Sequence, residues 1–190
     1  MGRKRSIDRD GLMQAVETVA RRVGVSGLSL DAVAKEAGVS KSSVVYDCEG
    51  KAGLLAAFVR HQIAQFRKAH GEAYARHRDI ATPNPWLHAM LDEFRIAPSD
   101  DDISITMLIS ASMGENAECR DVMRKALVQD IETVVAQAAE PCKMLRTLLT
   151  LQGMLFLECF GFHRFDEVTR NEILDDLMVL VDSDKGAAIP

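Results

Sequence analysis

Residues 29–51 read SLDAVAKEAGVSKSSVVYDCEGK, and this stretch predicts two short helices joined by a glycine turn. A small residue, Ala34, lets two helices cross closely, and Gly38 can adopt the positive φ that ends a helix. Val39 and Val44 follow the glycine at intervals that pack the second helix against the first. This spacing of small, apolar and glycine residues is typical of a helix-turn-helix.

The first residues of the second helix are the part of such a motif that faces base edges in the major groove. Ser29 and Ser40 are predicted to cap the two helices through their side-chain oxygens. Lys41 is suited to read a guanine, but a lysine also binds a phosphate as a point charge, and both roles remain open. The hydroxyls of Ser42 and Ser43 distinguish bases poorly because they both donate and accept hydrogen bonds.

The charge of the chain is unevenly distributed along the sequence. The net charge is −5, yet residues 1–78 hold 14 Lys and Arg against 8 Asp and Glu, a net of +6, and residues 79–190 carry −11. A basic head on an acidic body suits a protein that contacts a polyanion at one end. Arg3, Lys4 and Arg5 form a basic arm that either adds electrostatic affinity for DNA or is a solvated tail.

The rest of the chain shows helical periodicity, and no segment alternates with a strand's period of two. The sequence therefore predicts an all-α fold of about nine helices: a three-helix head, residues 1–50, on a larger helical body, residues 51–190. No apolar run reaches the length of a membrane span. Besides the two helices of the motif, we expect helices over about residues 7–23, 51–74, 85–94, 103–113, 118–138, 141–160 and 167–181, with loops at 24–27 and 97–102.

The predicted helix over residues 141–160 is apolar on nearly all sides, and another apolar-faced helix follows it. A helix of this kind lies either at the centre of a core or between subunits. Two such helices from each of two chains would form a four-helix dimer interface. A central core helix in a monomer is the alternative.

Several sharper chemical interpretations fail on the sequence. HRDIATPN, residues 77–84, has kinase catalytic-loop spacing, but the chain lacks the glycine-rich loop and the other kinase motifs. Cys159 and His163 are spaced to share a metal ion, but two ligands do not make a site. No nucleophile and base pair up elsewhere, so we expect no enzyme activity, no metal and no cofactor. With no secretory signal, we expect a cytoplasmic protein whose four cysteines are reduced.

Residues 10–58 resemble the head of the tetracycline-repressor family of bacterial transcription regulators. The resemblance lies in a first helix, the pattern SxxxVAxxAGVSKSSV and a lysine that opens the fourth helix, Lys51. It implies that Ser29 stands where the family has a capping threonine beside a phosphate, that Lys41, Ser42 and Ser43 face the groove, and that Lys51 meets a phosphate. The body is similar only in being helical and of suitable length.

The sequence departs from the family pattern at the end of the motif. The family commonly has Tyr-x-Tyr/His-Phe there, whereas this chain has Val45, Tyr46, Asp47 and Cys48. Tyr46 can take over the phosphate contact of the tyrosine replaced by Val45, or the operator contacts differ. Asp47 is expected to weaken DNA binding. The predicted DNA-contacting residues are Ser29, Ser40, Lys41, Ser42, Ser43, Tyr46 and Lys51.

The resemblance also implies a ligand-responsive regulator, expected to be a repressor, that binds a palindromic operator as a homodimer through its two C-terminal helices. A small, largely apolar effector bound in the body would release it from the DNA. The alternative is a helical small-molecule-binding protein whose head no longer binds DNA. His88 or His163 could supply a polar contact to the effector. The predicted lining residues are Trp86, Met90, Phe94, Met107, Met113, Met123, Phe156 and Phe160.

Overall fold

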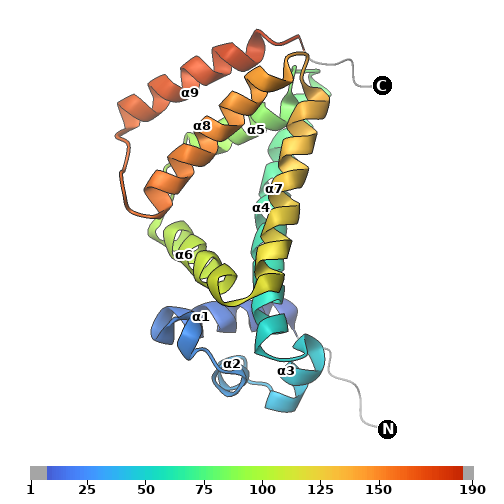
Figure 1. The fold of residues 1–190 in the computed structure, drawn as a ribbon, viewed down its shortest axis with the longest axis vertical. Coiled ribbons are helices and arrows are strands. Elements are labelled where there is room, and N and C mark those ends of the chain that lie inside the picture. The colour runs from blue at the N-terminus through green and yellow to red at the C-terminus, as the bar shows by residue number, and fades with distance from the viewer. Residues whose placement is uncertain (1–7, 186–190) are drawn as a thin grey trace. The chain divides into compact units, whose positions relative to one another are not determined.

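The computed structural model describes residues 8–185, and over this range it contains nine helices and no strand (Figure 1). The predicted all-α fold is confirmed. Arg3, Lys4 and Arg5 of the basic arm lie outside the described residues. The helices are α1 (Arg9–Gly27), α2 (Leu30–Glu36), α3 (Lys41–Cys48), α4 (Lys51–Asp79), α5 (Pro85–Phe94), α6 (Asp100–Glu115), α7 (Ala117–Gln137), α8 (Pro141–Cys159) and α9 (Glu167–Asp182).

The described chain divides into two compact units. Unit 1 consists of residues 8–63 and 104–124, and unit 2 consists of residues 64–103 and 125–185. Helices α4, α6 and α7 therefore contribute residues to both units. The division into a DNA-binding part, residues 1–50, and an effector-binding part, residues 51–190, is a functional one and stays a prediction.

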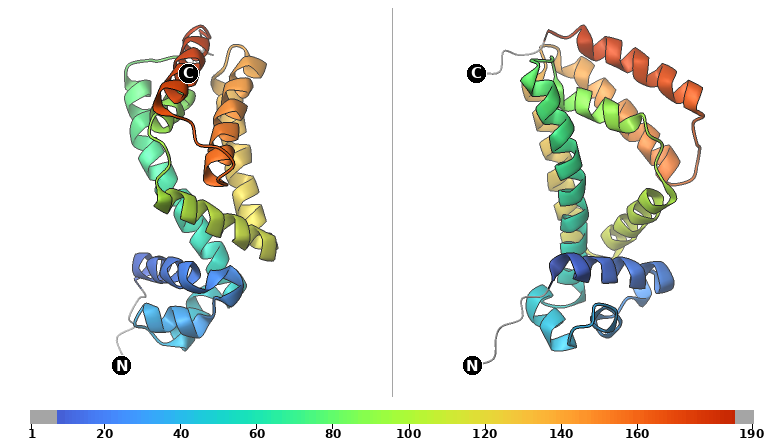
Figure 2. Two further views of the ribbon diagram at one scale, coloured as in Figure 1. Left: turned by 90° about the vertical axis from the view of Figure 1, so that its left-hand side faces the viewer. Right: turned by 180° about the vertical axis from the view of Figure 1, so that it is seen from behind.

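Unit 1 is built around the buried face of α1, against which α2 and α3 lie together (Figure 2). Leu12 and Val16 of α1 pack with Val33 of α2, Val44 of α3 and Phe58 of α4, all at most 1% exposed. Burying each such side chain contributes about 1.5–3 kcal/mol. This small core holds α3 in a fixed orientation on α1 and α4.

Both predicted serine caps are confirmed. The Ser29 hydroxyl accepts a hydrogen bond from the backbone N–H of Ala32 at 3.2 Å, and the Ser40 hydroxyl accepts one from Ser43 at 3.1 Å. Gly38 has φ 66, the left-handed conformation that the turn needs. The local signals in residues 29–44 are thus enough to specify the α2–α3 pair.

Unit 2 has its core where α5, α8 and α9 pack together (Figure 1). Leu87 and Leu91 of α5 meet Met144 and Leu151 of α8 and Leu174 of α9, and all five are fully buried. A charged pair crosses this core: the guanidinium of Arg170 contacts the carboxylate of Glu158 and donates to the backbone oxygen of Phe94 at 2.9 Å. Both charged side chains are 3% exposed.

The ends of α1 and α4 differ from the sequence-based expectation. A loop was predicted at residues 24–27, but only Gly24 leaves the helical region, with φ 74, and one further turn follows it to Gly27. Helix α4 was predicted to end near Tyr74 but continues to Asp79. Basic residues in its last turn favour this extension because their positive charges interact favourably with the negative end of the helix dipole.

The predicted loop at residues 97–102 is also wrong in its second half, because α6 begins at Asp100. A reciprocal cap explains the early start. The backbone N–H of Ser99 donates to the carboxylate of Asp102 at 2.9 Å, and the N–H of Asp102 donates to the Ser99 hydroxyl at 3.2 Å. A run of acidic residues that looks like a loop is therefore the first turn of a helix.

Two apolar surfaces of unit 2 are exposed in the single chain. Phe66 of α4 is 50% exposed and stacks on the ring of His70. Helix α8 was predicted to be apolar on nearly all sides. It buries Met144, Leu148 and Leu151, yet Leu149 and Phe156 on its other face are 67% and 52% exposed.

Candidate nucleic-acid interface

The outer face of α3 carries most of the residues predicted to contact DNA. Val44 and Cys48 point inward and anchor the helix, while Lys41, Ser42 and Tyr46 are exposed. Tyr46 is 79% exposed, so its phenol projects from the head. Exposed lysine, serine and tyrosine side chains on one short helix can reach both phosphates and base edges.

Lys41 is not a free cation. Its ammonium lies 2.8 Å from the carboxylate of Asp31 in the first turn of α2. Both side chains are more than half exposed, and an ion pair of this kind is worth no more than about 1 kcal/mol. A phosphate or a guanine can therefore compete with Asp31 for Lys41.

The serines at the start of α3 form one hydroxyl cluster. The Ser40 oxygen lies 2.9 Å from that of Ser42 and 2.7 Å from that of Ser43, in addition to its capping bond. Because the hydroxyls bond to each other, their orientation is restricted. The predicted contacts Ser40, Ser42 and Ser43 thus form one polar surface next to Lys41.

Lys51, at the start of α4, is held by groups within unit 1. Its ammonium donates to the backbone oxygen of Ser26 at 3.0 Å and lies 3.9 Å from the carboxylate of Glu115. The side chain must leave these partners to reach a phosphate. The backbone N–H groups of the first turn of α4 have no acceptor within the helix and favour an anion.

The tight turn between α3 and α4 depends on Gly53. A Cβ at this position would lie 2.0 Å from the backbone oxygen of Cys48, so only glycine allows α4 to start this close to the end of α3. Glu49 and Gly50 between the helices both have positive φ. The turn therefore sets where Lys51 stands relative to α3.

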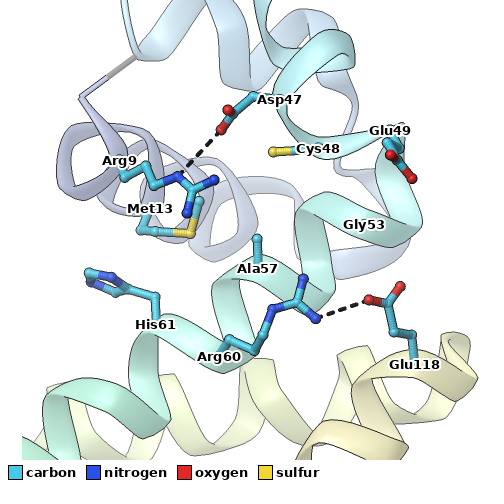
Figure 3. Close-up of a pocket in the computed structure, with 10 residues that line it drawn as sticks. All are labelled: Arg9, Met13, Asp47, Cys48, Glu49, Gly53, Ala57, Arg60, His61 and Glu118. Carbon is cyan, nitrogen blue, oxygen red and sulfur yellow. Dashed lines mark hydrogen bonds and ion pairs between the residues drawn. The ribbon is translucent and has the colours of Figure 1, made fainter. Parts of the chain in front are cut away.

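A hollow of about 410 Å³ lies beside this turn (Figure 3). Its cations are paired: Arg9 lies 3.7 Å from Asp47, and Arg60 donates to Glu118 at 3.0 Å. Asp47, expected to weaken DNA binding, thus has its charge partly offset by Arg9. Burial and the nearby Asp47 charge raise the pKa of the Cys48 thiol, which keeps it protonated and unreactive. The lining residues are Arg9, Met13, Asp47, Cys48, Glu49, Gly53, Ala57, Arg60, His61 and Glu118.

The residues predicted to line an effector site fall in both units. On α5, Met90 and Phe94 are buried in the core of unit 2, and Trp86 packs at its edge. Phe156 of α8 and Phe160, which follows its last residue, form an aromatic group with ring centres 4.8 Å apart. The other three belong to unit 1: Met107 is 47% exposed, and Met113 and Met123 pack against its core.

The two histidines considered for polar contacts differ in their surroundings. His88 is buried, 3.2 Å from Asp182, and burial lowers the pKa of its imidazole. His163 is exposed and makes an edge contact with Phe165. Within residues 8–185, no group of His, Cys, Asp and Glu is arranged to hold a metal ion.

The family model described as "Tetracyclin repressor-like, C-terminal domain" matches residues 84–182, more than half of the chain. The chain belongs to the tetracycline-repressor family. This tetracycline-repressor-family protein is a transcription regulator and not an enzyme. The family model matches residues 84–182 of the body, whereas the sequence resemblance covers residues 10–58 of the head. The two lines of evidence therefore rest on different residues. No curated protein matches the chain.

Solved structures share the fold of this regulator. A protein assigned as a transcriptional regulator from Pseudomonas aeruginosa PAO1 is 15% identical, with a TM-score of 0.70 over 92% of this chain and 90% of that one. The multidrug binding protein EbrR, complexed with malachite green, is 21% identical, with a TM-score of 0.70 over 90% and 98%. A regulator from Saccharomonospora viridis in complex with choline is 17% identical, with a TM-score of 0.65 over 90% and 95%.

Sequence reasoning missed three residues that shape the head of this regulator. Asp31 was assigned no role, because its pairing with Lys41 depends on how α2 and α3 cross. Arg9 was assigned no role, although it pairs with Asp47. Gly53 interrupts a helical pattern two residues after Lys51, a detectable signal of close backbone approach.

Proposed function

We propose that this regulator is a cytoplasmic repressor that binds a palindromic DNA operator as a homodimer and is released by a small effector. Residues 1–50 bind the DNA, and residues 51–190 dimerise and take the effector. The exposed outer face of α3, with Lys41, Ser42 and Tyr46, carries this proposal. None of the helices in the described range is long and apolar enough to cross a membrane.

The head makes two kinds of contact with the operator. Lys41 and the hydroxyl cluster of Ser40, Ser42 and Ser43 lie in the major groove, where Lys41 reads a guanine. Ser29, Tyr46 and Lys51 contact phosphates, which set the affinity and the register. Tyr46 replaces the tyrosine that the family carries one position earlier, and its exposure supports this role.

The exposed apolar face of α8 and α9 supports the dimer. Leu149 and Phe156 of α8 and Val179 of α9 are 52–69% exposed in the single chain. Gly153 lies between Leu149 and Phe156, and among residues 8–185 no atom from beyond the neighbouring turns of α8 lies within 4 Å of where its Cβ would stand, so a partner helix can approach closely. Exposed apolar area of this kind is stabilised by burial in an interface. Two heads would then meet half-sites about 34–36 Å apart.

The effector binds more tightly to the dimer geometry that does not fit DNA than to the one that does. It therefore shifts the repressor toward the state that leaves the operator. A preference of a few kcal/mol is enough to shift the population. The predicted lining residues on α5 and at the end of α8, among them Trp86 and Phe160, suit a largely apolar ligand. The structures with malachite green and choline support this only as examples of the fold holding small organic molecules.

A gel-shift titration on the DNA upstream of the chain's own gene tests the proposal. We expect a complex that weakens steeply with salt, and Lys41→Ala should weaken it at least tenfold. Lys68→Ala removes the same charge from an exposed position of α4 in unit 2 and serves as the matched control. The proposal fails if no promoter fragment gives a salt-sensitive complex.

The second candidate function is a helical small-molecule-binding protein whose head no longer binds DNA. The carboxylates of Asp31 and Asp47 on the head favour it, because one neutralises Lys41 and both repel phosphates. Effector binding without any DNA complex would support this function instead.

A further inference from the structure

An aromatic cluster joins α4 to α5 within unit 2. Phe66, His70 and Tyr74 recur every four residues along one face of α4 and meet Trp86 of α5. The rings of His70 and Trp86 touch edge to face with centres 4.1 Å apart, and Tyr74 meets Trp86 in the same way at 5.5 Å. We call these four residues and Glu93, which contacts His70, the His70–Trp86 cluster.

Two hydrogen-bonding atoms of this cluster are buried and have no partner among the described residues. His70 is 1% exposed, and its Nδ1 lies 3.2 Å from both carboxylate oxygens of Glu93. Its Nδ1–H therefore donates to Glu93, and Nε2 is left as an acceptor in the neutral ring. Within residues 8–185, neither Nε2 of His70 nor the indole Nε1–H of Trp86 has a hydrogen-bond partner. An unmet buried polar atom is costly, so two on rings in contact point to a ligand group.

The charged groups around the cluster are already paired. Glu93 accepts from His70, and Asp130 lies 3.1 Å from the guanidinium of Arg67. Arg67 also donates to the backbone oxygen of Ala126 at 3.1 Å. A charged ligand would have to displace one of these partners, whereas a neutral ligand would not.

We propose that the His70–Trp86 cluster binds the effector through a hydroxyl group of a neutral, otherwise apolar molecule. A hydroxyl both donates and accepts, so it can donate to Nε2 of His70 and accept from the indole N–H of Trp86. An ammonium cannot accept from the indole. A carboxylate would add a charge near Glu93 and Asp130. The proposal rests on the proposed function, whose effector it assigns to a chemical class.

Three probes with one carbon frame test the ligand class. These are 4-tert-butylcyclohexanol, the corresponding carboxylate and the corresponding ammonium, none of which absorbs where tryptophan is excited. Trp86 is the only tryptophan of the chain, so its fluorescence reports on this cluster alone. We expect the alcohol to change the fluorescence saturably and both charged probes to bind at least tenfold more weakly. Equal or tighter binding of a charged probe, or no saturable response to the alcohol, overturns the proposal.

Two variants and a control test the residues, with affinity measured by calorimetry because one variant loses the fluorophore. Trp86→Phe keeps an aromatic ring and removes the N–H, and His70→Asn keeps a donor for Glu93 and removes Nε2. Each variant should bind the alcohol about tenfold more weakly, which is the effect of losing one hydrogen bond. Lys68→Ala should leave the affinity unchanged, because Lys68 is an exposed residue of α4 outside the cluster. Thermal melts confirm that the variants fold; unchanged affinity in both folded variants refutes the assignment.

The DNA titration of the proposed function separates the two ideas. If the alcohol binds and no operator complex forms, the ligand class stands and the repressor function fails. If the operator complex forms and the alcohol does not bind, the repressor function stands and the hydroxyl-binding cluster fails.

Discussion

Replacing Asp31 by asparagine should strengthen operator binding. Asp31 holds the ammonium of Lys41 at 2.8 Å, and Lys41 is the head's main candidate for contacting DNA. Asparagine keeps the size of the side chain and removes its charge. The change therefore frees Lys41 and removes a repulsion between the carboxylate and the phosphates.

The size of the effect follows from the exposure of the pair. Both side chains are more than half in solvent, so breaking the pair recovers no more than about 1 kcal/mol. A carboxylate roughly 7 Å from a phosphate in water contributes about 0.6 kcal/mol of repulsion. About 1 kcal/mol per head, and two heads per dimer, correspond to roughly 30-fold tighter binding. Stability should fall by no more than about 1 kcal/mol, because a first-turn helix charge and an exposed ion pair with Lys41 are both weak.

Fluorescence anisotropy with a labelled operator at several salt concentrations measures this gain. The slope of log affinity against log salt should become steeper, because each freed Lys41 can neutralise one more phosphate. Glu132→Gln, the same change of charge on α7 in unit 2, is the control and should have little effect. In the Lys41→Ala background the part of the gain that comes from freeing Lys41 should vanish. Unchanged or weaker binding by Asp31→Asn would show that Lys41 does not contact DNA.

Three further predictions concern unit 2. Glu158→Ala leaves the guanidinium of Arg170 buried without its counter-charge and should destabilise the fold by about 3–5 kcal/mol in a urea titration, whereas Glu158→Leu with Arg170→Met should recover most of this loss. Burial lowers the pKa of His88 below its unfolded value, so the unfolded chain binds more protons and stability should fall as the pH drops below about 6.5. His88→Gln should flatten this part of the plot of melting temperature against pH. A plot that the variant leaves unchanged would contradict this prediction. Phe156→Glu puts a charge on the exposed face of α8. In analytical ultracentrifugation the variant should sediment as a monomer instead of a dimer, while its melting temperature stays nearly constant. A dimer that persists would place the interface elsewhere.

Local signals were enough for most of the helices and for the head. Ser29, Ser40 and Gly38 act through bonds and backbone angles within a few residues, so their roles could be read from spacing alone. Helix ends were less predictable. The acidic run before Ile103 forms a helical turn because Ser99 and Asp102 cap each other, an arrangement that composition does not reveal.

Burial on α4 and α8 could not be read from composition. Phe66 and Leu149 are as apolar as their buried neighbours, and only the packing of other helices decides which face is covered. The same holds for the buried pair of Arg170 and Glu158, which are 12 positions apart and meet only when α8 and α9 pack.

The sequence by itself determined the fold class, the helix-turn-helix and the resemblance to a regulator family, because these depend on periodicity and on contacts between near neighbours. The tertiary structure decided which charges meet. Asp31 pairs with Lys41, and Glu93 pairs with His70, because separate helices bring them together. Electrostatic and hydrogen-bond energies depend on distance in space, and residues 10 or 23 positions apart acquire that distance only when the helices pack.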